Sequence, residues 1–300
     1  MKEDSIVFAL SANKKLAKKV SEILSIPLGE CEIERFADNE LMVRCLSNVK
    51  DKKVYVIQST SSPATERIFE ILVFADALRN REASEIILIL PYYGYSRQDR
   101  VARVGEPITA KLVAGLYQSA GVDRVISIDL HTYQIQGFFS CPVTNIETTG
   151  LFGDYFRKKF AEDGVDHKDL VVVTPDHGSS LRARDLGSMF DNCSIAFIDK
   201  RRPAPNKSEV TAVVGDVKGK VCLIVDDIFD TCGTLNNAVQ ALFDKGAKEI
   251  YACATHAIFS STNFDKRIKD IVVTDTVEKE VPGVKVLSVA SLIADAIVQG

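Results

Sequence analysis

Short runs of apolar residues alternate with amphipathic stretches along most of the chain. The runs are rich in Val and Ile and contain few polar residues, which is typical of strands covered on both faces. The pattern predicts strands at Ile6–Leu10, Val54–Ile57, Ile86–Leu90, Val125–Leu130, Leu170–Val173, Ile195–Ile198, Val221–Val225, Ile250–Ala254 and Ile271–Val273.

Helical periodicity fills several of the intervals between these runs. From Leu235 to Phe243 apolar residues recur at the spacing of one helix face, and Gly246 follows where a helix commonly ends. Another helix is predicted to have Pro107 in its first turn, a position that suits proline, and to end before Gly121. Alternating strands and helices predict parallel sheets in an α/β fold.

A weak internal repeat divides the chain. The segments GVDRVISIDLH (121–131) and GAKEIYACATH (246–256) each begin with a Gly, continue as a strand and end in a His. The segments EIILILPYYGYS and KVCLIVDDIFDT also stand in comparable places, each ahead of a helix. Two correspondences in the same order favour duplication. We therefore expect two similar domains, residues 1–147 and 148–300, each a mostly parallel sheet flanked by helices.

Composition and charge narrow the class of protein. The 300 residues are 46% hydrophobic and 26% charged, with a formal net charge of -4, which is ordinary for a globular protein. This charge argues against broad nucleic-acid binding, which needs a basic face. No apolar run approaches the ~20 residues of a membrane span, and no signal peptide is apparent. The seven cysteines are scattered rather than arranged as a disulfide framework, so we expect a cytoplasmic protein. Together with the charge and the short apolar runs, this predicts a protein that binds neither membrane nor nucleic acid.

Three carboxylates follow the predicted strand Val221–Val225. Asp226 and Asp227 are adjacent, and Asp230 precedes a turn, Thr231–Thr234, that is rich in hydroxyls and contains a glycine. Open α/β sheets bind ligands at the carboxyl ends of their strands, and a helix N-terminus after such a turn suits a phosphate. Two carboxylates ~4 Å apart repel by about 4 kcal/mol at an effective dielectric near 20, so they need a proton, a sugar diol or Mg²⁺ between them. The segment predicts a sugar phosphate site; the alternative is a solvated acidic turn.

Two further segments offer contacts for a nucleotide. In RFADNE, Phe36 can stack on a base, and Asp38 and Glu40 can accept hydrogen bonds from exocyclic amines, although for this segment alone a structural turn is the better explanation. In PYYGYSRQDR, Arg97 and Gln98 follow a buried strand, where an arginine can bind phosphate oxygens. The alternative is an aromatic turn with solvated arginines.

Three more segments carry candidate residues for phosphate or metal. Asp129 and His131 share one side if their strand continues, and they could contact a metal or a phosphate. In VVVTPDHGSSLRAR, residues 178–180 open a predicted helix, and Asp176 could hold Mg²⁺. DKRRPAPN (199–206) places three cations on a predicted mobile loop, with a solvated basic patch as the alternative.

VDDIFDTCGT resembles the phosphoribosyl pyrophosphate (PRPP) motif shared by phosphoribosyltransferases and ribose-phosphate pyrophosphokinases, the PRPP synthetases. This motif alone leaves the choice between the two open. RFADNE, IQSTSSP, PYYGYSRQDR, EPITAK, QIQGFF, PDHG, DKRRP and GAKEIYACATH also resemble the PRPP synthetase family in order and spacing across nearly the whole chain. This coverage favours the synthetase over a single-domain phosphoribosyltransferase.

The resemblance implies two phosphoribosyltransferase-like domains, with the nucleotide on the N-terminal domain and ribose 5-phosphate and a catalytic loop on the C-terminal domain. It implies transfer of the diphosphoryl group of ATP to the C1 hydroxyl of ribose 5-phosphate, giving PRPP and AMP. It also implies Mg²⁺ as cofactor and a homo-oligomer built from dimers, up to a hexamer.

The same resemblance gives each group of residues an expected role. The residues expected to bind ATP are Phe36, Asp38, Asn39, Glu40, Arg97 and Gln98. Those expected to bind ribose 5-phosphate are Arg202, Asp226, Asp227, Asp230, Thr231, Cys232, Gly233 and Thr234. The expected catalytic residues are Lys200, Arg202 and His131, and the expected metal contacts are His131 and Asp176.

The sequence departs from the family pattern at several points. Ser140 and Thr144 stand where the family commonly has Asp, and Asn39 stands where it has Gly. The segment VARVGEP is less basic than usual, and the sequence ends at IADAIVQG. The resemblance therefore leaves open whether phosphate activates the protein and whether ADP inhibits it.

Three other functions fit parts of the same pattern. A non-catalytic subunit associated with a synthetase is disfavoured because Lys200 and Arg202 are retained. A phosphoribosyltransferase that consumes PRPP would lack the N-terminal half. A PRPP-sensing DNA-binding regulator would need a basic helix-turn-helix, and none is apparent.

Overall fold

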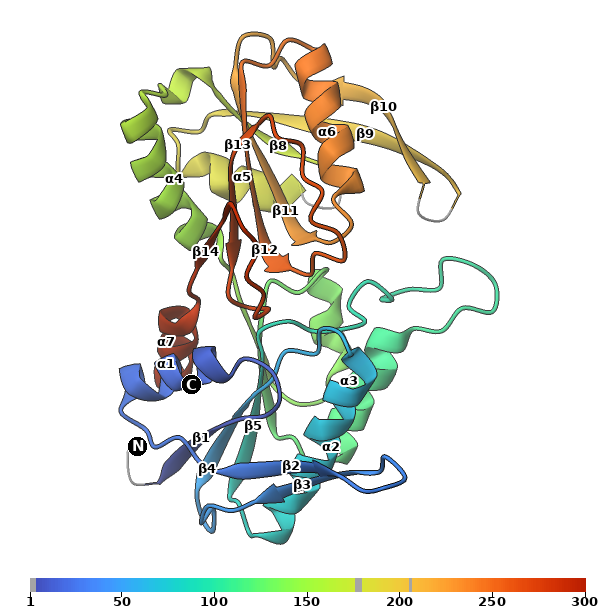
Figure 1. Ribbon diagram of the computed structural model, residues 1–300, viewed down its shortest axis with the longest axis vertical. Coiled ribbons are helices and arrows are strands. Elements are labelled where there is room, and N and C mark those ends of the chain that lie inside the picture. Colours follow the sequence, from blue (N-terminus) through green and yellow to red (C-terminus); the bar gives the residue numbers. More distant parts are fainter. Residues whose placement is uncertain (1–3, 176–179, 205–206) are drawn as a thin grey trace. The chain divides into compact units, whose positions relative to one another are not determined.

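A computed structural model describes residues 4–175, 180–204 and 207–300, without the side chains of residues 200–211. The chain forms two compact units (Figure 1). The first unit holds Met1–Ile146, Asp275–Glu278 and Ser288–Gly300, and the second holds Glu147–Thr274 and Lys279–Leu287. The domain ranges expected from the sequence, 1–147 and 148–300, stay a prediction. The compact units differ from them because two C-terminal segments lie with the first unit.

The first unit is built on a five-stranded parallel sheet of order β1-β4-β5-β6-β7. Its strands are β1 (Ser5–Ala9), β4 (Lys53–Ile57), β5 (Glu85–Leu90), β6 (Arg124–Ile128) and β7 (Val143–Ile146). Its helices are α1 (Lys14–Leu24), α2 (Ala64–Asn80), α3 (Thr109–Ser119), the 3₁₀ helix η1 (Tyr133–Phe138) and α7 (Ala290–Gln299). The red helix α7 lies beside α1 in Figure 1, which brings the C-terminal end of the chain to this unit.

A separate hairpin of β2 (Cys31–Arg35) and β3 (Leu41–Cys45) belongs to the same unit and packs on α2. We did not predict the flanking strands, because RFADNE was interpreted as a turn or as a nucleotide contact. The residues of that turn form the tip of the hairpin.

The second unit is built on a seven-stranded sheet of order β10-β9-β8-β11-β12-β13-β14. All neighbours are parallel except β9 and β10. Its strands are β8 (Leu170–Thr174), β9 (Ser194–Ala204), β10 (Lys207–Val214), β11 (Val221–Phe229), β12 (Glu249–Ala257), β13 (Ile268–Thr274) and β14 (Val284–Leu287). Its helices are α4 (Thr149–Asp163), the 3₁₀ helix η2 (His167–Asp169), α5 (Ser180–Ser188) and α6 (Gly233–Asp244).

The central strands of this sheet are buried on both faces, as the apolar runs predicted. Ile224 of β11 packs in one cluster with Leu235 of α6, whereas its neighbour Val225 packs in another cluster with Phe156 of α4. Alternate residues of a strand point to opposite faces, so each face has its own core. The α/β class with two mainly parallel sheets is thereby confirmed.

Several local predictions are confirmed and others are wrong. Gly246 has φ of 85° just after α6, as expected of a residue that ends a helix. Pro107 does not lie in the first turn of α3, because that helix begins at Thr109. Residues 199–204 belong to β9 rather than to a loop, and the strand after Ile128 does not continue to His131.

No helix in the described residues is both long and apolar enough to cross a membrane.

Candidate active site

β11 carries two of the predicted sugar-binding carboxylates within the strand itself, since it runs on to Phe229 rather than ending at Val225. Asp226 is half-buried, and Asp227 is only 5% exposed. Neighbouring strand residues point to opposite faces of a sheet. This alternation lowers the repulsion expected between the two carboxylates, and their common contact with one sugar stays a prediction.

Each of these carboxylates has its own neighbour. The backbone N–H of Asp227 donates a hydrogen bond to Asp226 Oδ1 over 2.9 Å. Arg182 of α5 brings its Nη1 to 4.0 Å from Asp227 Oδ1, and both side chains are largely buried. A cation at this distance compensates a buried negative charge. Sequence reasoning missed Arg182, whose only signal was its place in the segment GSSLRAR.

The turn between β11 and α6 contains both exposed and buried residues. Thr231, Gly233 and Thr234 are exposed, whereas Cys232 is buried with φ of 63°. The Cys232 thiol donates to the carbonyl oxygen of Ser261 at 3.0 Å, and burial raises its pKa to about 11. Cys232 can therefore reach a ligand only through its backbone N–H. No side chain caps the first turn of α6, which leaves its N–H groups available to an anion.

Gly233 borders open space. A Cβ atom built on this residue would meet only Thr231 Oγ1, at 3.6 Å, which is ordinary van der Waals contact. The protein itself therefore does not require glycine here, whereas a ligand that approaches the backbone closely would.

Asp230 closes the other side of the turn. Its Oδ1 accepts hydrogen bonds from the hydroxyl and, at 3.4 Å, the N–H of Ser260. Its carbonyl oxygen accepts from Ser261 N–H. These bonds join the turn to the segment that follows β12.

The turn lies at a topological switch of the sheet. The chain proceeds from β8 outward to β9 and then returns to β11 on the other side of β8. In open α/β sheets the crevice for ligands forms at the carboxyl ends of the strands where the order reverses. Residues 176–179 follow β8, so Asp176 lies outside the described residues. Lys200 and Arg202 have their backbone in β9, but their side chains lie outside the description.

The tip of the β2–β3 hairpin holds four residues expected to bind ATP. Phe36 is 54% exposed, and its N–H donates to the carbonyl of Glu40 at 2.9 Å. Asp38 Oδ1 accepts from Glu40 N–H at 3.1 Å. Asn39 has φ of 70°, a left-handed conformation that glycine adopts most readily and asparagine tolerates. The departure from Gly at this position therefore fits the backbone.

The loop after β5 is held by contacts with the segment that follows β4. Thr60 Oγ1 accepts a hydrogen bond from Gly94 N–H at 2.6 Å, and a Cβ atom on Gly94 would come within 2.1 Å of the Thr60 carbonyl oxygen. Only glycine allows this approach. The loop continues to Arg97 and Gln98, which are exposed, and Gln98 Oε1 accepts from Thr109 at 2.6 Å.

The segment that contains His131 is hydrogen-bonded to this loop. Thr132 donates to Asp99 Oδ2 at 2.9 Å, which joins the segment after β6 to the segment after β5. His131 is exposed, whereas Asp129 is 4% exposed with φ of 41°. The expectation that the two share a strand face is wrong, because β6 ends at Ile128.

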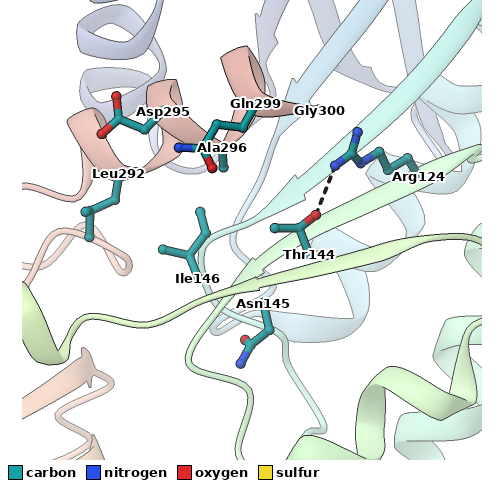
Figure 2. Close-up of a pocket in the computed structure, with 9 residues that line it drawn as sticks. All are labelled: Arg124, Thr144, Asn145, Ile146, Leu292, Asp295, Ala296, Gln299 and Gly300. Carbon is teal, nitrogen blue, oxygen red and sulfur yellow. Dashed lines mark hydrogen bonds between the residues drawn. The ribbon is translucent and has the colours of Figure 1, made fainter. Parts of the chain in front are cut away.

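A pocket of about 500 Å³ in the first unit lies apart from these residues (Figure 2). It is bordered by α7 and by β6 and β7, and none of the residues expected to bind a substrate lines it. Thr144, one of the departures from the family, accepts a hydrogen bond there from Arg124 Nη2 at 3.0 Å. Ser140, another departure, donates to Gln118 at 3.4 Å.

Within the described residues no group of three or more His, Cys, Asp or Glu side chains could hold a metal ion.

Comparison with models of known protein families identifies the class of protein. Residues 5–121 match the model of the N-terminal domain of ribose phosphate pyrophosphokinase, and residues 145–288 match the phosphoribosyl transferase domain. With the fold, these matches define an α/β protein with two domains of the phosphoribosyltransferase type.

Relatives that align with nearly the whole chain identify the family. The ribose-phosphate pyrophosphokinase of Bacillus caldolyticus is 46% identical, with 97% of this chain and 93% of the relative covered. The Bacillus subtilis protein of the same name is 44% identical over 98% and 93%. The crystal structure of phosphoribosylpyrophosphate synthetase from Mycobacterium smegmatis superposes with a TM-score of 0.90 at 37% identity, covering 98% of this chain and 97% of that one. The chain belongs to the ribose-phosphate pyrophosphokinase family, as the motifs predicted.

Proposed function

We infer that the protein is a ribose-phosphate pyrophosphokinase, a transferase of nucleotide biosynthesis. It transfers the diphosphoryl group of ATP to the C1 hydroxyl of ribose 5-phosphate and releases AMP. The observation that carries this inference is the turn Asp230–Thr234, which stands at the topological switch of the second unit in a chain related to such enzymes over its whole length.

The sugar phosphate occupies this turn in our proposal. The 5-phosphate lies over Gly233, where the backbone is open, and takes hydrogen bonds from N–H groups of the first turn of α6 and from the hydroxyls of Thr231 and Thr234. Asp226 and Asp227 accept hydrogen bonds from the ribose hydroxyls, and the Arg182 guanidinium stands 4.0 Å from the Asp227 carboxylate as its counter-charge.

ATP binds to the residues of the first unit in this proposal. Phe36 stacks on the adenine, and the acidic residues Asp38 and Glu40 accept from its amino group. Arg97 and Gln98 contact the nucleotide from the loop that Thr60 and Gly94 hold.

The reaction places demands on alignment and charge. The C1 oxygen of the sugar attacks the β-phosphorus of ATP, the bond from that phosphorus to the oxygen shared with the α-phosphate breaks, and AMP leaves. Such transfers need positioned reactants and compensation of charge more than covalent help. We assign charge compensation to Lys200 and Arg202, whose cations would stabilise negative charge on the transferred group. His131 is proposed as a catalytic residue through contact with the metal.

Mg²⁺ fits the site only together with a substrate. Mg²⁺ is commonly held by one or two protein ligands plus substrate phosphates, which agrees with the lack of a three-ligand cluster in the described residues. We propose His131 and Asp176 as the protein contacts. A bound Mg²⁺ ion would neutralise part of the phosphate charge.

We further propose a homo-oligomer built from dimers, up to a hexamer, and a cytoplasmic location where ATP is available. Both rest on the family resemblance. Light scattering coupled to gel filtration tests the first, and a monomer at micromolar concentration would contradict it.

An assay of AMP release with Mg²⁺ tests the activity. We expect AMP to appear only when ATP and ribose 5-phosphate are both present, in equal amounts with PRPP. A non-catalytic subunit would release no AMP, and a phosphoribosyltransferase would instead consume PRPP in the presence of a base. Repeating the assay with added phosphate and with ADP shows whether phosphate activates the enzyme and whether ADP inhibits it.

A further inference from the structure

The base of the β2–β3 hairpin holds two cysteines directly opposite each other. Cys31 is the first residue of β2, Cys45 is the last residue of β3, and the two are paired in the register of the hairpin. Among the seven cysteines no other two are paired in the strand registers that the structure describes.

The hydrogen-bond pattern defines the kind of pair. Leu46 N–H donates to the carbonyl of Glu30 at 2.9 Å, so residues 30 and 46 belong to a hydrogen-bonded pair. The two kinds of pair alternate along an antiparallel ladder, so Cys31 and Cys45 form a non-hydrogen-bonded pair, in which the Cα atoms stand about 4.5 Å apart. Disulfides span Cα separations of about 4.4 to 6.8 Å. The backbone is therefore already suited to a disulfide.

Both thiols lie on the inner face of the hairpin. Cys45 is 5% exposed and belongs to the core of the first unit, and Cys31 is half-buried against that core. The Cys31 thiol donates to the Ala9 carbonyl and the Cys45 thiol to the Ser47 carbonyl, each at 3.4 Å. Thiols are weak donors, so these bonds give little resistance to rotation of the side chains toward each other.

We propose that Cys31 and Cys45 are an oxidation site, at which a small-molecule disulfide such as oxidised glutathione converts the two thiols into a cross-strand disulfide. The half-buried Cys31 reacts first: its thiolate attacks one sulfur of oxidised glutathione, a mixed disulfide forms, and one glutathione leaves. The Cys45 thiolate then attacks the Cys31 sulfur and releases the second glutathione. Two electrons pass from the cysteine pair to the reagent, and both protons end on the released glutathiones.

The surroundings make this a slow site at neutral pH. Burial raises the pKa of Cys31 to about 11, with a further increase from the Cys45 thiol and from Glu70 and a decrease from Lys14. Burial also raises the pKa of Cys45, and Arg81 opposes this. Only thiolates take part in the exchange, so the rate rises about tenfold for each pH unit between pH 7 and 9.

The disulfide fastens the base of a hairpin whose tip carries Phe36 and Glu40. If the proposed function holds, oxidation changes the KM for ATP more than the KM for ribose 5-phosphate. This extension rests on the proposed function, whereas the chemistry at the cysteines does not.

Peptide mapping tests the oxidation directly and needs no activity. The intact protein is incubated with oxidised glutathione at pH 8, alkylated and digested with trypsin. We expect Val20–Arg35 linked to Cys45–Lys50, and hydrogen exchange of residues 31–45 slowed at least about tenfold in the oxidised protein. Dithiothreitol reverses both.

Matched variants complete the test. Cys45→Ser, with Cys45→Ala as a second variant in case serine disturbs the core, is expected to stop at a mixed disulfide on Cys31. Cys141→Ser is expected to keep the linked peptide. Linkage of Cys31 to another cysteine, or a stable mixed disulfide on Cys31 in the wild-type protein with no linked peptide, would overturn the proposal.

Discussion

Gly233 is the residue at which the structure and the proposed chemistry meet most closely. Its backbone borders open space, and neither its φ angle nor a neighbouring atom excludes a side chain. A glycine that the fold does not need, in a turn at the end of a central strand, is explained by a ligand lying against the backbone.

Gly233→Ala therefore separates binding from stability. We expect the KM for ribose 5-phosphate to rise at least about tenfold, because the added methyl group occupies the space of the phosphate. The melting temperature should stay within about 2 °C, since the methyl group has room in the free protein. Steady-state kinetics and calorimetry provide the two values.

Gly150→Ala is the matched control, because a Cβ atom there meets nothing within 4 Å and Gly150 lies in α4, away from the turn. It should leave the KM unchanged. An unchanged KM in Gly233→Ala would place the phosphate elsewhere.

Arg182 and Asp227 form a second pair to test at the residue scale. Removing the cation leaves a buried carboxylate, so Arg182→Met should lower the free energy of unfolding by about 1–3 kcal/mol. Asp227→Asn in the same chain removes the uncompensated charge and should restore at least half of the loss.

Urea unfolding is measured for the wild type, the two single variants and the double variant. The four free energies of unfolding give the interaction energy between Arg182 and Asp227. Costs that simply add would contradict an interaction between the two side chains.

Strands could be predicted from the sequence where both of their faces are buried. The strands β4, β5, β8 and β11 are covered on both faces, so their continuous apolar runs were sufficient. The hairpin β2–β3 was missed because its two sides are only partly buried, and because CEIER alternates apolar and polar residues but LMVRC does not. The short strands β7 and β14 have four residues each, too few to show a period.

The candidate site was predictable to a similar degree. The turn from Asp226 to Thr234 could be found because its polar residues interrupt an apolar strand. The contributions of Arg182, Thr60 and Asp99 could not, because each depends on a contact between segments far apart in the sequence.

The end of α4 shows how an element is held by charge. Asp163 accepts hydrogen bonds from Tyr251 of β12 at 2.6 Å and from Lys159 at 3.0 Å. These bonds, the one from Tyr251 above all, lower the pKa of Asp163 below its ordinary value of 3.8. A carboxylate that is more acidic when folded contributes stability that is present above its unfolded pKa and is lost as the pH falls through its folded pKa.

Asp163→Asn should therefore be less stable than the wild type by about 1 kcal/mol at pH 6, and the difference should shrink as the pH falls below 4. Urea midpoints measured from pH 7 to pH 3 test this. Asp154→Asn is the control, since Asp154 is exposed and pairs only within α4 in the interactions described. A difference that stays constant with pH would contradict the assigned cause.

The β9–β10 hairpin carries the predicted catalytic cations. Lys200→Ala should lower kcat at least ~100-fold, the usual cost of removing one group that stabilises charge in a transition state. Lys266→Ala, at an exposed position after β12, should have no such effect. Nearly wild-type turnover in Lys200→Ala would remove this residue from the mechanism.

At the scale of the whole molecule the two units share a plan but not a topology. Both have a central parallel sheet, and the repeated segments at Gly121 and Gly246 both begin with a glycine at positive φ and lead into a strand, β6 and β12. The order of the strands reverses only in the second unit among the strands described. This difference explains why the sugar phosphate is proposed there, and why loops and a hairpin of the first unit are proposed for the nucleotide.

A crystal structure with ribose 5-phosphate bound tests the central claim most directly. The account predicts the phosphate within hydrogen-bonding distance of the N–H groups and hydroxyls of residues 230–234, over Gly233, and the ribose hydroxyls facing Asp226 and Asp227. An empty turn at saturating sugar phosphate, or a sugar bound at another place on the chain, would contradict it.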